Sequence, residues 1–491
     1  MTASGRASGA AWGWRSNLSK TQVGAFADYL VAVVSHFREA HGLHFTTVAP
    51  FNEPREISWW AGTNQEGCRF TPRQQRRVVS ALAARLRAAG LLSSAHDETG
   101  SLVTPVSLVP STDRKEVKIA VADENAVGRA TSSLEHALSR RVSIKKHAPR
   151  TRPTDGRPPT AESGGVVATL AGLSPPDLAA IGRVNTHGYS GAASRPALAA
   201  MAALAGLPVW MSEVGYGHAP PSHPASASHL AAHVAADINT MGAVGWVYWQ
   251  AVEDADGGSW KGLLKRGAPL SSLPFRFGFA VANWWWAAKQ AARGALVALA
   301  RRDRAAMDEY LEPWWGLVQV SFSGTTGGPG DLVLSKQFHA LAQYSRAMRA
   351  GWSVVDVPPE RAADTVVALA PDGQSLSIIA TNDTERERAA SFDLGPFLAS
   401  CTAAAAAASK KAKSLGLSLK AGPANSGGAW ISVTRTDAGL DGEALEPMVM
   451  GGGAAGDCVL EDTLPPRSVT TYVVATVAPP EEKKKGAEVR E

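Results

Sequence analysis

Two glutamates in this sequence, Glu53 and Glu213, each follow a short apolar run and stand where a strand would end. They are far apart along the chain, so only a fold that gathers strand ends could bring them together. Two carboxyl groups roughly 5 Å apart can hydrolyse a glycosidic bond with retention of configuration. One attacks the anomeric carbon, while the other protonates the leaving oxygen and then activates water. The pair therefore predicts double-displacement chemistry on a sugar.

The first glutamate has the more specific surroundings. It lies in residues 51–54, where a proline directly after it fixes φ, lacks a backbone N–H and turns the chain away. Asn52 can then reach a sugar hydroxyl. Alone, such a segment is more often a plain turn, but the loop that follows carries Trp59 and Trp60, which suit stacking on sugar faces. We therefore expect Asn52, Trp59 and Trp60 to bind substrate.

The second glutamate lies in residues 210–215, after a short apolar run and just before a glycine. This places it at the exit of a strand with room for a ligand. Taken alone, the pattern fits equally well a glutamate that pairs with an arginine at the rim of a barrel. A third acidic site, Asp123 with Glu124, also follows an apolar run, and we expect that pair to be structural or supporting.

Helical and strand-like segments alternate around these residues. Helical patterns occupy four segments, 21–41, 71–89, 194–205 and 225–241, and in the first of them apolar residues recur at three- and four-residue spacing. Strand-like segments, most of them short apolar runs, occupy five others, 44–49, 117–122, 183–186, 208–212 and 244–249. Such alternation predicts βαβ units and a parallel sheet. Polar or aromatic residues end each predicted strand, as at the carboxyl ends of the strands in a barrel enzyme.

The chain is long enough for more than one domain. We expect a barrel domain over 1–350, with insertions near 148–165 and 254–313. Short alternating runs separated by turn residues predict a smaller antiparallel β-domain over 351–476. Residues 477–491, which include three consecutive lysines, are expected to form a disordered tail.

Several segments, in the same order along the chain, resemble glycoside hydrolase family 30, and most closely its endo-β-1,6-galactanase branch. They are residues 48–54, 184–189, 210–215, 245–250, 336–351 and 464–470. The resemblance implies an α/β fold, a (β/α)8 TIM barrel with an attached C-terminal antiparallel β-sandwich. It also implies that Glu53 is the acid/base and Glu213 the nucleophile, and that Asn52, His187, Tyr189 and Trp249 line the sugar site.

The resemblance further places residues 1–5 inside the barrel, in a loop after its third strand. We therefore expect the first three strands to be missing from this chain and the remaining partial barrel to expose two sheet edges. No signal peptide is recognisable, but members of this family are commonly secreted, so an extracellular location is expected.

Composition and residue spacing limit the kinds of partner and cofactor that we expect for this chain. The net charge of +5 comes from scattered basic residues and no nucleic-acid module is recognisable, so nucleic acid is not expected as a partner. No apolar run is long enough to span a membrane. His187 has no second His or Cys at ligand spacing, so we expect neither a metal nor another cofactor. We expect a monomer acting on a polysaccharide or glycoconjugate.

Alternatives remain within and outside this class. A β-glucosylceramidase or a xylanase of the same family would use the same two glutamates, because loops decide the substrate. A catalytically decayed homologue that only binds carbohydrate is the alternative of a different class. In an active enzyme, Glu213 must be ionised to attack, so we expect hydrogen-bond donors near it, with His187 and Tyr189 as the candidates. Its charge would favour the protonated form of Glu53.

Overall fold

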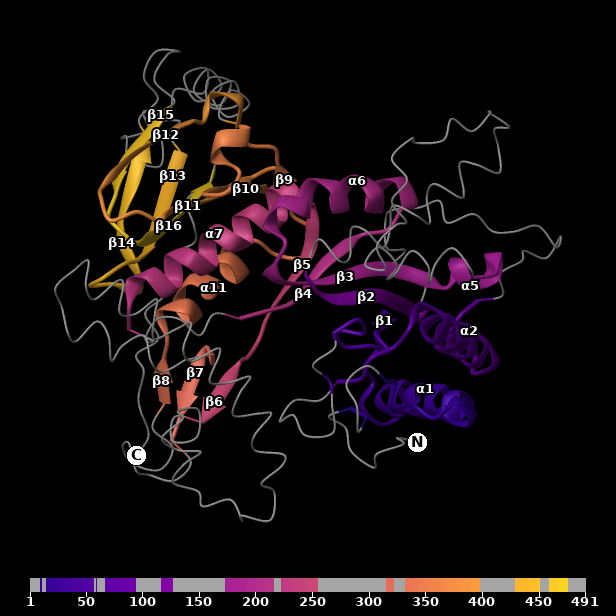
Figure 1. Cartoon of the computed structure of the whole chain (residues 1–491). Coiled ribbons are helices and arrows are strands. Elements are labelled where there is room, and N and C mark those ends of the chain that lie inside the picture. Colours follow the sequence, from indigo (N-terminus) through magenta and orange to yellow (C-terminus); the bar gives the residue numbers. More distant parts are fainter. Residues whose placement is uncertain are drawn as a thin grey trace, which may run out of the picture. The chain divides into compact units, whose positions relative to one another are not determined.

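The computed structural model describes residues 9–10, 15–56, 59, 67–93, 116–126, 173–215, 222–254, 315–321, 332–397, 429–450 and 459–475. The chain divides into two compact units (Figure 1). Unit 1 comprises residues 1–215, 240–249 and 267–297. Unit 2 comprises residues 216–239, 250–266 and 298–491.

Unit 1 is built on a curled parallel sheet in the order β1-β2-β3-β4-β5 (Figure 1). Each strand is parallel to its neighbour, and strands consecutive in sequence are neighbours in the sheet. All five carboxyl ends therefore meet at one edge. The strands are β1 (Thr47–Val48), β2 (Lys118–Ala126), β3 (Ile181–Ser190), β4 (Val209–Val214) and β5 (Ala243–Tyr248).

The helices of unit 1 begin and end at residues suited to those positions. Thr71 caps α2 with its side chain, Gln74 completes a capping box, and Pro72 takes the first helical position. Gly42 ends α1 with a φ of 65°. The helices are α1 (Val23–His41), α2 (Pro72–Ala88), α5 (Pro175–Ala179) and α6 (Arg195–Ala205), with short 3₁₀ turns η1 (Lys20–Gln22) and η2 (Ala192–Ser194).

The core of unit 1 comes from the apolar runs that predict these elements. Strands of a parallel sheet are buried on both faces and so read as nearly continuous apolar runs. Ile119, Val184 and Met211, from three adjacent strands, are completely buried. Val78 and Leu82 on α2, four residues apart on one helix face, are buried too.

Unit 2 contains most of α7 (Pro224–Met241), up to Asn239, and α11 (Lys336–Ala347). Tyr344 of α11 donates a hydrogen bond to the carbonyl of Ala231 in α7 at 2.9 Å, which joins the two helices. A small sheet is formed by β6 (Val252–Asp254), β7 (Val318–Val320) and β8 (Leu332–Leu334), with β6 and β7 parallel.

The remaining strands of unit 2 form two antiparallel sheets. A six-stranded sheet has the order β14-β13-β16-β11-β10-β9, and β12 pairs with β15. Side chains from both sheets, among them Ile378, Ile431, Leu460 and Tyr472, share one hydrophobic core. The strands are β9 (Ser353–Val355), β10 (Thr365–Leu369), β11 (Ser375–Asn382), β12 (Arg388–Asp393), β13 (Ala429–Thr436), β14 (Asp441–Met450), β15 (Val459–Leu464) and β16 (Ser468–Ala475), with the 3₁₀ turn η4 (Pro359–Arg361) before β10.

The predicted α/β class, the parallel sheet and the C-terminal antiparallel strands are confirmed. The insertion expected at 148–165, the tail at 477–491, and all of 254–313 except Asp254 lie outside the described residues. The expected domain boundary near 350 stays a prediction. Within the described ranges, no helix has the length and apolar character needed to cross a bilayer.

Candidate active site

Four ionisable side chains gather at the carboxyl edge of the parallel sheet. Glu53 follows β1, Asp123 lies near the end of β2, His187 is in β3 and Glu213 is in β4. His187 and Glu213 are partners in the register of β3 and β4. The backbone N–H of Glu53 donates to the carbonyl of Asp123 at 2.9 Å. We call these four residues the His187 cluster.

Glu53 is held in an unusual backbone conformation. Its φ is 43°, in the left-handed region that few residues other than glycine adopt, and such strain is often found at functional sites. Trp59 secures it by donating from Nε1 to the Glu53 carbonyl at 3.1 Å. The side chain of Glu53 is only 9% exposed, so its carboxyl group lies in the interior of unit 1.

His187 lies at the centre of the cluster with its side chain 1% exposed. Its Nδ1 is 3.1 Å from Oε1 of Glu53 and 3.7 Å from Oε1 of Glu213, while its Nε2 is 3.3 Å from Oδ1 of Asp123. Burial lowers the pKa of His187, but the hydrogen bonds to Asp123 and Glu53 and the nearby negative charges outweigh it and raise the pKa to about 10. The ring is therefore an imidazolium at neutral pH and donates from both nitrogens.

Glu213 has a different environment from Glu53. Its side chain is 25% exposed, and Oε1 accepts a hydrogen bond from the hydroxyl of Tyr189 at 2.9 Å. Burial raises the pKa of Glu213, and the charge of His187 and the Tyr189 hydrogen bond counteract part of that effect. Burial and the charge of Glu213 raise the pKa of Tyr189, so the phenol keeps its proton and remains a donor.

The spacing of the two glutamates limits the chemistry. A carboxylate oxygen of Glu53, a ring nitrogen of His187 and a carboxylate oxygen of Glu213 all lie within 4.8 Å of one another. Inverting glycosidases separate their carboxyl groups by roughly 6.5–9.5 Å, whereas retaining ones hold them about 5–5.5 Å apart. Glu53, His187 and Glu213 also offer the oxygen and nitrogen atoms that could hold a metal ion, and the hydrogen bond between His187 and Glu53 gives two of these side chains a second role.

The other residues expected to bind substrate differ in their placement. Asn52 is half-buried next to Glu53 in the chain. Tyr189 contacts Glu213, and Trp249, half-buried, donates its N–H to the Val214 carbonyl at the same sheet edge. Trp59, predicted from its loop to stack on sugars, is 4% exposed and donates to the Glu53 carbonyl, so we now expect it to support Glu53. Trp60 lies outside the described residues.

The structure adds Asp123 and Ser212 to the site. Ser212 donates from Oγ to Oδ1 of Asp123 at 2.6 Å and also approaches the Thr186 carbonyl at 3.2 Å. The sequence signal for Asp123 was its place at the end of a predicted strand, where only a supporting role was expected. Nothing in the residue pattern indicated its contact with His187, because that contact depends on the local backbone irregularity of β2.

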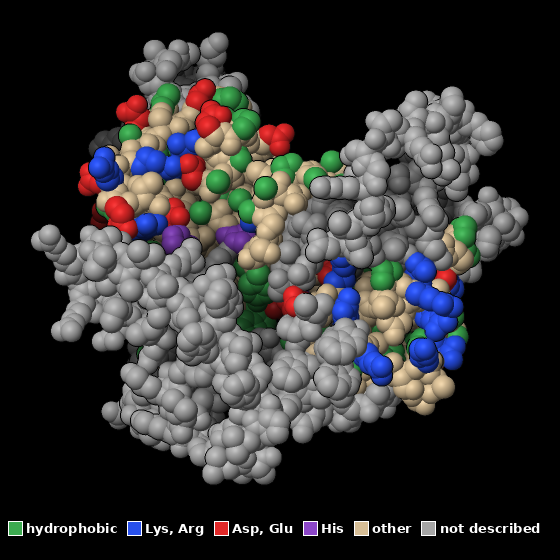
Figure 2. Space-filling model, in the orientation of Figure 1, with side chains coloured by type: hydrophobic (Ala, Val, Ile, Leu, Met, Phe, Trp, Pro, Cys, Tyr) green, Lys and Arg blue, Asp and Glu red, His purple; other side chains and the backbone are tan. Residues whose placement is uncertain are grey.

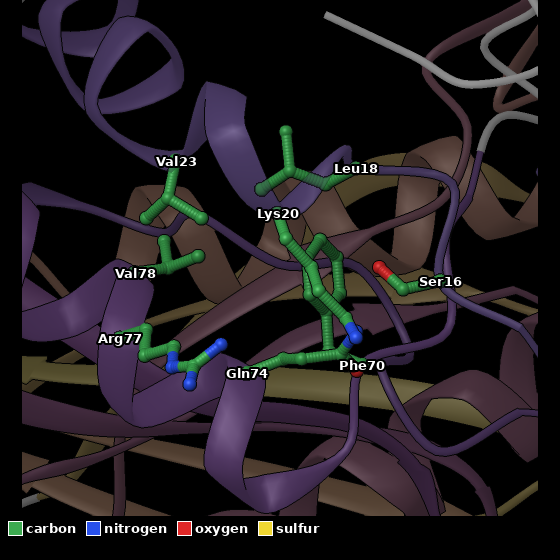
Figure 3. A pocket seen from close by; sticks show the side chains of 8 residues that line it. All are labelled: Ser16, Leu18, Lys20, Val23, Phe70, Gln74, Arg77 and Val78. Atoms are coloured by element: carbon green, nitrogen blue, oxygen red, sulfur yellow. The ribbon is translucent and has the colours of Figure 1, made fainter.

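A hollow in unit 1, lined by residues other than the His187 cluster, has no such chemistry. Its lining includes Lys20, Phe70 and Arg77 and no carboxylate (Figure 3). Basic side chains also gather on the visible face over the region of α2, where Arg73 and Arg85 are exposed along with Arg77 (Figure 2). These arginines lie on an exposed face of α2. Neither this face nor the hollow offers a reactive group.

Known glycoside hydrolases are similar to parts of this sequence. The family model described as O-glycosyl hydrolase family 30 matches residues 1–98. An endo-beta-1,6-galactanase from Hypocrea rufa is 25% identical over 249 residues, which cover 50% of this chain and 38% of the relative. The matched part therefore spans well under half of that protein.

Solved structures show a similar fold. A conserved exported protein from Bacteroides fragilis has a TM-score of 0.52 and 16% identity, over 96% of this chain and 73% of the other. A family 30 subfamily 8 xylanase from Clostridium acetobutylicum has a TM-score of 0.49 and 14% identity, over 95% of this chain and 75% of the other.

Proposed function

We propose that this chain, which belongs to glycoside hydrolase family 30, is a retaining glycosidase that cleaves β-linked galactan. The observation that carries the proposal is that a carboxylate oxygen of Glu53 and one of Glu213 lie within 4.8 Å of each other, with the protonated ring of His187 beside both. This spacing suits direct attack by one carboxylate while the other transfers the proton.

In the first step, an ionised oxygen of Glu213 attacks the anomeric carbon and forms an ester. The bond from that carbon to the glycosidic oxygen breaks, and the leaving oxygen takes the proton of Glu53. Tyr189 supports the assignment of Glu213 as nucleophile, because its hydroxyl donates to Oε1 at 2.9 Å and stabilises the ionised form.

In the second step, Glu53 acts as a base. It takes a proton from water, whose oxygen attacks the anomeric carbon and displaces the carboxylate of Glu213. The two inversions leave the configuration unchanged, one water is consumed per bond and both side chains return to their starting states. His187 donates toward Glu53 at 3.1 Å, and this stabilises Glu53 when it becomes negative between the two steps.

The substrate class rests on the likeness to the endo-beta-1,6-galactanase, which supports β-1,6-linked galactan and action within the polymer. A xylanase or a β-glucosylceramidase would use the same pair, and a decayed binding homologue would keep it without turnover. We also propose that the five parallel strands are part of a (β/α)8 barrel, that the antiparallel sheets form a β-sandwich, and that the enzyme acts outside the cell as a monomer.

The test is hydrolysis of β-1,6-galactan, xylan and glucosylceramide by the chain, beside Glu213→Gln and Glu53→Gln. Oligosaccharides from galactan, released first as the β-anomer in proton NMR and absent with E213Q, are the expected result. First release of the α-anomer would overturn the retaining mechanism. A folded chain that binds galactan but cuts none of the three would favour the binding homologue.

Azide then separates the roles of the two glutamates. With a substrate whose leaving group needs no proton, Glu53→Ala should still form the ester but lack the base for its hydrolysis. Azide, which needs no base, should restore turnover and give the β-azide. Restoration by azide in Glu213→Ala with the same β-configuration would reverse the assignment.

A further inference from the structure

Asp123 makes three separate contacts within the His187 cluster. Its backbone carbonyl accepts the N–H of Glu53 at 2.9 Å. Its Oδ1 accepts the hydroxyl of Ser212 at 2.6 Å and lies 3.3 Å from Nε2 of His187. One residue is therefore bonded directly to the backbone of one glutamate and to the residue that precedes the other.

The backbone of Asp123 is shaped for this position. Its φ is 47°, next to the 43° of Glu53 to which it is hydrogen-bonded. Aspartate tolerates the left-handed region better than most residues. The register of β2 against β3 is also irregular between Ala122 and Glu124, as expected where a bulge redirects a side chain.

The charge of Asp123 is placed opposite the two glutamates. The groups that face the ring of His187 are Glu53 and Glu213 at Nδ1 and Asp123 at Nε2, with the un-ionised Tyr189 bonded to Glu213. From β5, Tyr248 interacts with Tyr189. A neutral ring fixed on Asp123 through an Nε2–H would have no proton at Nδ1, and both contacts to the glutamates would lose their donor.

We propose that Asp123 is a positioning residue: it holds the His187 ring between Glu53 and Glu213, with a proton on each ring nitrogen. The proposal rests on the proposed function for its consequence in catalysis, but the arrangement itself can be measured without turnover. Asp123 acts through His187 and the Glu53 backbone and is not required to touch the sugar.

The experiment records the ring nitrogens of His187 by ¹⁵N NMR of the whole chain across pH, with the signal assigned by its loss in His187→Gln. In the wild-type chain both nitrogens should stay protonated through pH 9. Asp123→Asn keeps an oxygen acceptor but removes the charge, so the midpoint should fall by at least about one pH unit, a tenfold loss of proton affinity. Hydrolysis by D123N should also be slower than by the wild type above the lowered midpoint, where a neutral ring no longer donates to ionised Glu53.

Two controls separate charge from general disturbance. Ser212→Ala removes a hydrogen-bond partner of Asp123 but keeps the Asp123 carboxylate, so the His187 midpoint should move by less than about half a pH unit. Asp28→Asn, at a carboxylate whose side chain is 57% exposed in the same unit, should leave it unchanged. Should D123N not fold, Asp123→Ser, with a smaller oxygen acceptor, provides the same measurement.

An unchanged His187 midpoint in both variants at position 123, or an equal shift in S212A, would overturn the positioning role. A lowered midpoint in a chain that hydrolyses no glycan supports it and overturns only the proposed hydrolysis. A lowered midpoint together with slower hydrolysis above it supports both.

Discussion

Replacing Tyr189 by phenylalanine would remove a single hydroxyl from the site and leave the ring in place. That hydroxyl donates to Oε1 of Glu213 at 2.9 Å, and it lowers the pKa of a carboxyl group that burial raises. A hydrogen bond to a charged group contributes roughly 1.5–3 kcal/mol. At 1.36 kcal/mol for each pKa unit, its loss would raise the pKa of Glu213 by about one to two units.

The sign of the effect on rate follows directly. Glu213 must be ionised to attack, so the acid limb of kcat/KM should move to higher pH by about one to two units in Tyr189→Phe. At a pH near the acid limb of the wild type, the rate should fall by about 10- to 100-fold. Well above both limbs the loss should be smaller, because there Glu213 is ionised in both proteins.

The assay is the pH dependence of galactan hydrolysis by wild type and variant, with Tyr29→Phe as the matched control. Tyr29 on α1 is 53% exposed in the same unit, so its hydroxyl should not matter. An acid limb at the same pH in Y189F and wild type would show that the Tyr189 hydroxyl does not lower the pKa of Glu213, whatever the loss in rate. An equal displacement in Y29F would show that the effect is not specific to Glu213.

Three further predictions follow from named contacts. A Cβ on Gly67 would lie 2.3 Å from the ring of Trp59, so Gly67→Ala should lower stability by about 1–3 kcal/mol in thermal unfolding and slow hydrolysis by displacing Glu53. The control Gly24→Ala, whose Cβ would meet only Arg85 at 3.5 Å, should change neither the unfolding nor the rate. Asn382, fully buried, donates from Nδ2 to the carbonyls of Arg386, Leu464 and Pro465, so Asn382→Ala should destabilise unit 2 by about 3 kcal/mol in urea unfolding, and an unchanged midpoint would count against it. The pKa of His187 is raised from 6.5 to about 10, so protonation of the ring stabilises the folded state by at most about 5 kcal/mol. This contribution is fully present below pH 6.5 and is lost as pH rises through 10. Thermal unfolding of His187→Gln should therefore vary less over that range than wild type, and equal slopes would contradict the cause.

Much of the fold of unit 1 was predictable because its signals are local. The helix predicted over 71–89 is α2, which starts at the cap Thr71 and Pro72, and β2 to β4 match their predicted strands within a few residues. In unit 2, β14 was not predicted. Its residues 441–450 are mostly polar or exposed and show no regular apolar alternation. Leu445 and Met448 pack against the core, and the strand pairs with β13.

The residue types of the site and the donors to Glu213 were predictable, but its other connections were not. Glu53 and Glu213 stand out because each follows a short apolar run at the expected end of a strand, and because two tryptophans follow Glu53. The links through Asp123 depend on two left-handed residues and a register shift, and no sequence period encodes these. For Trp59 the structure favours a role other than the predicted one, since an aromatic residue in a loop can as readily support the backbone as bind a sugar.

The most direct test of the two-glutamate mechanism is to trap its covalent intermediate. A 2-deoxy-2-fluoro-β-galactoside with a good leaving group should form the ester quickly and release it slowly, because fluorine destabilises both oxocarbenium-like transition states. After digestion, mass spectrometry should find one sugar attached to the peptide that contains Glu213, and none in Glu213→Gln. A sugar on Glu53 or on another residue, or no sugar on a chain that still hydrolyses galactan, would show that Glu213 is not the nucleophile.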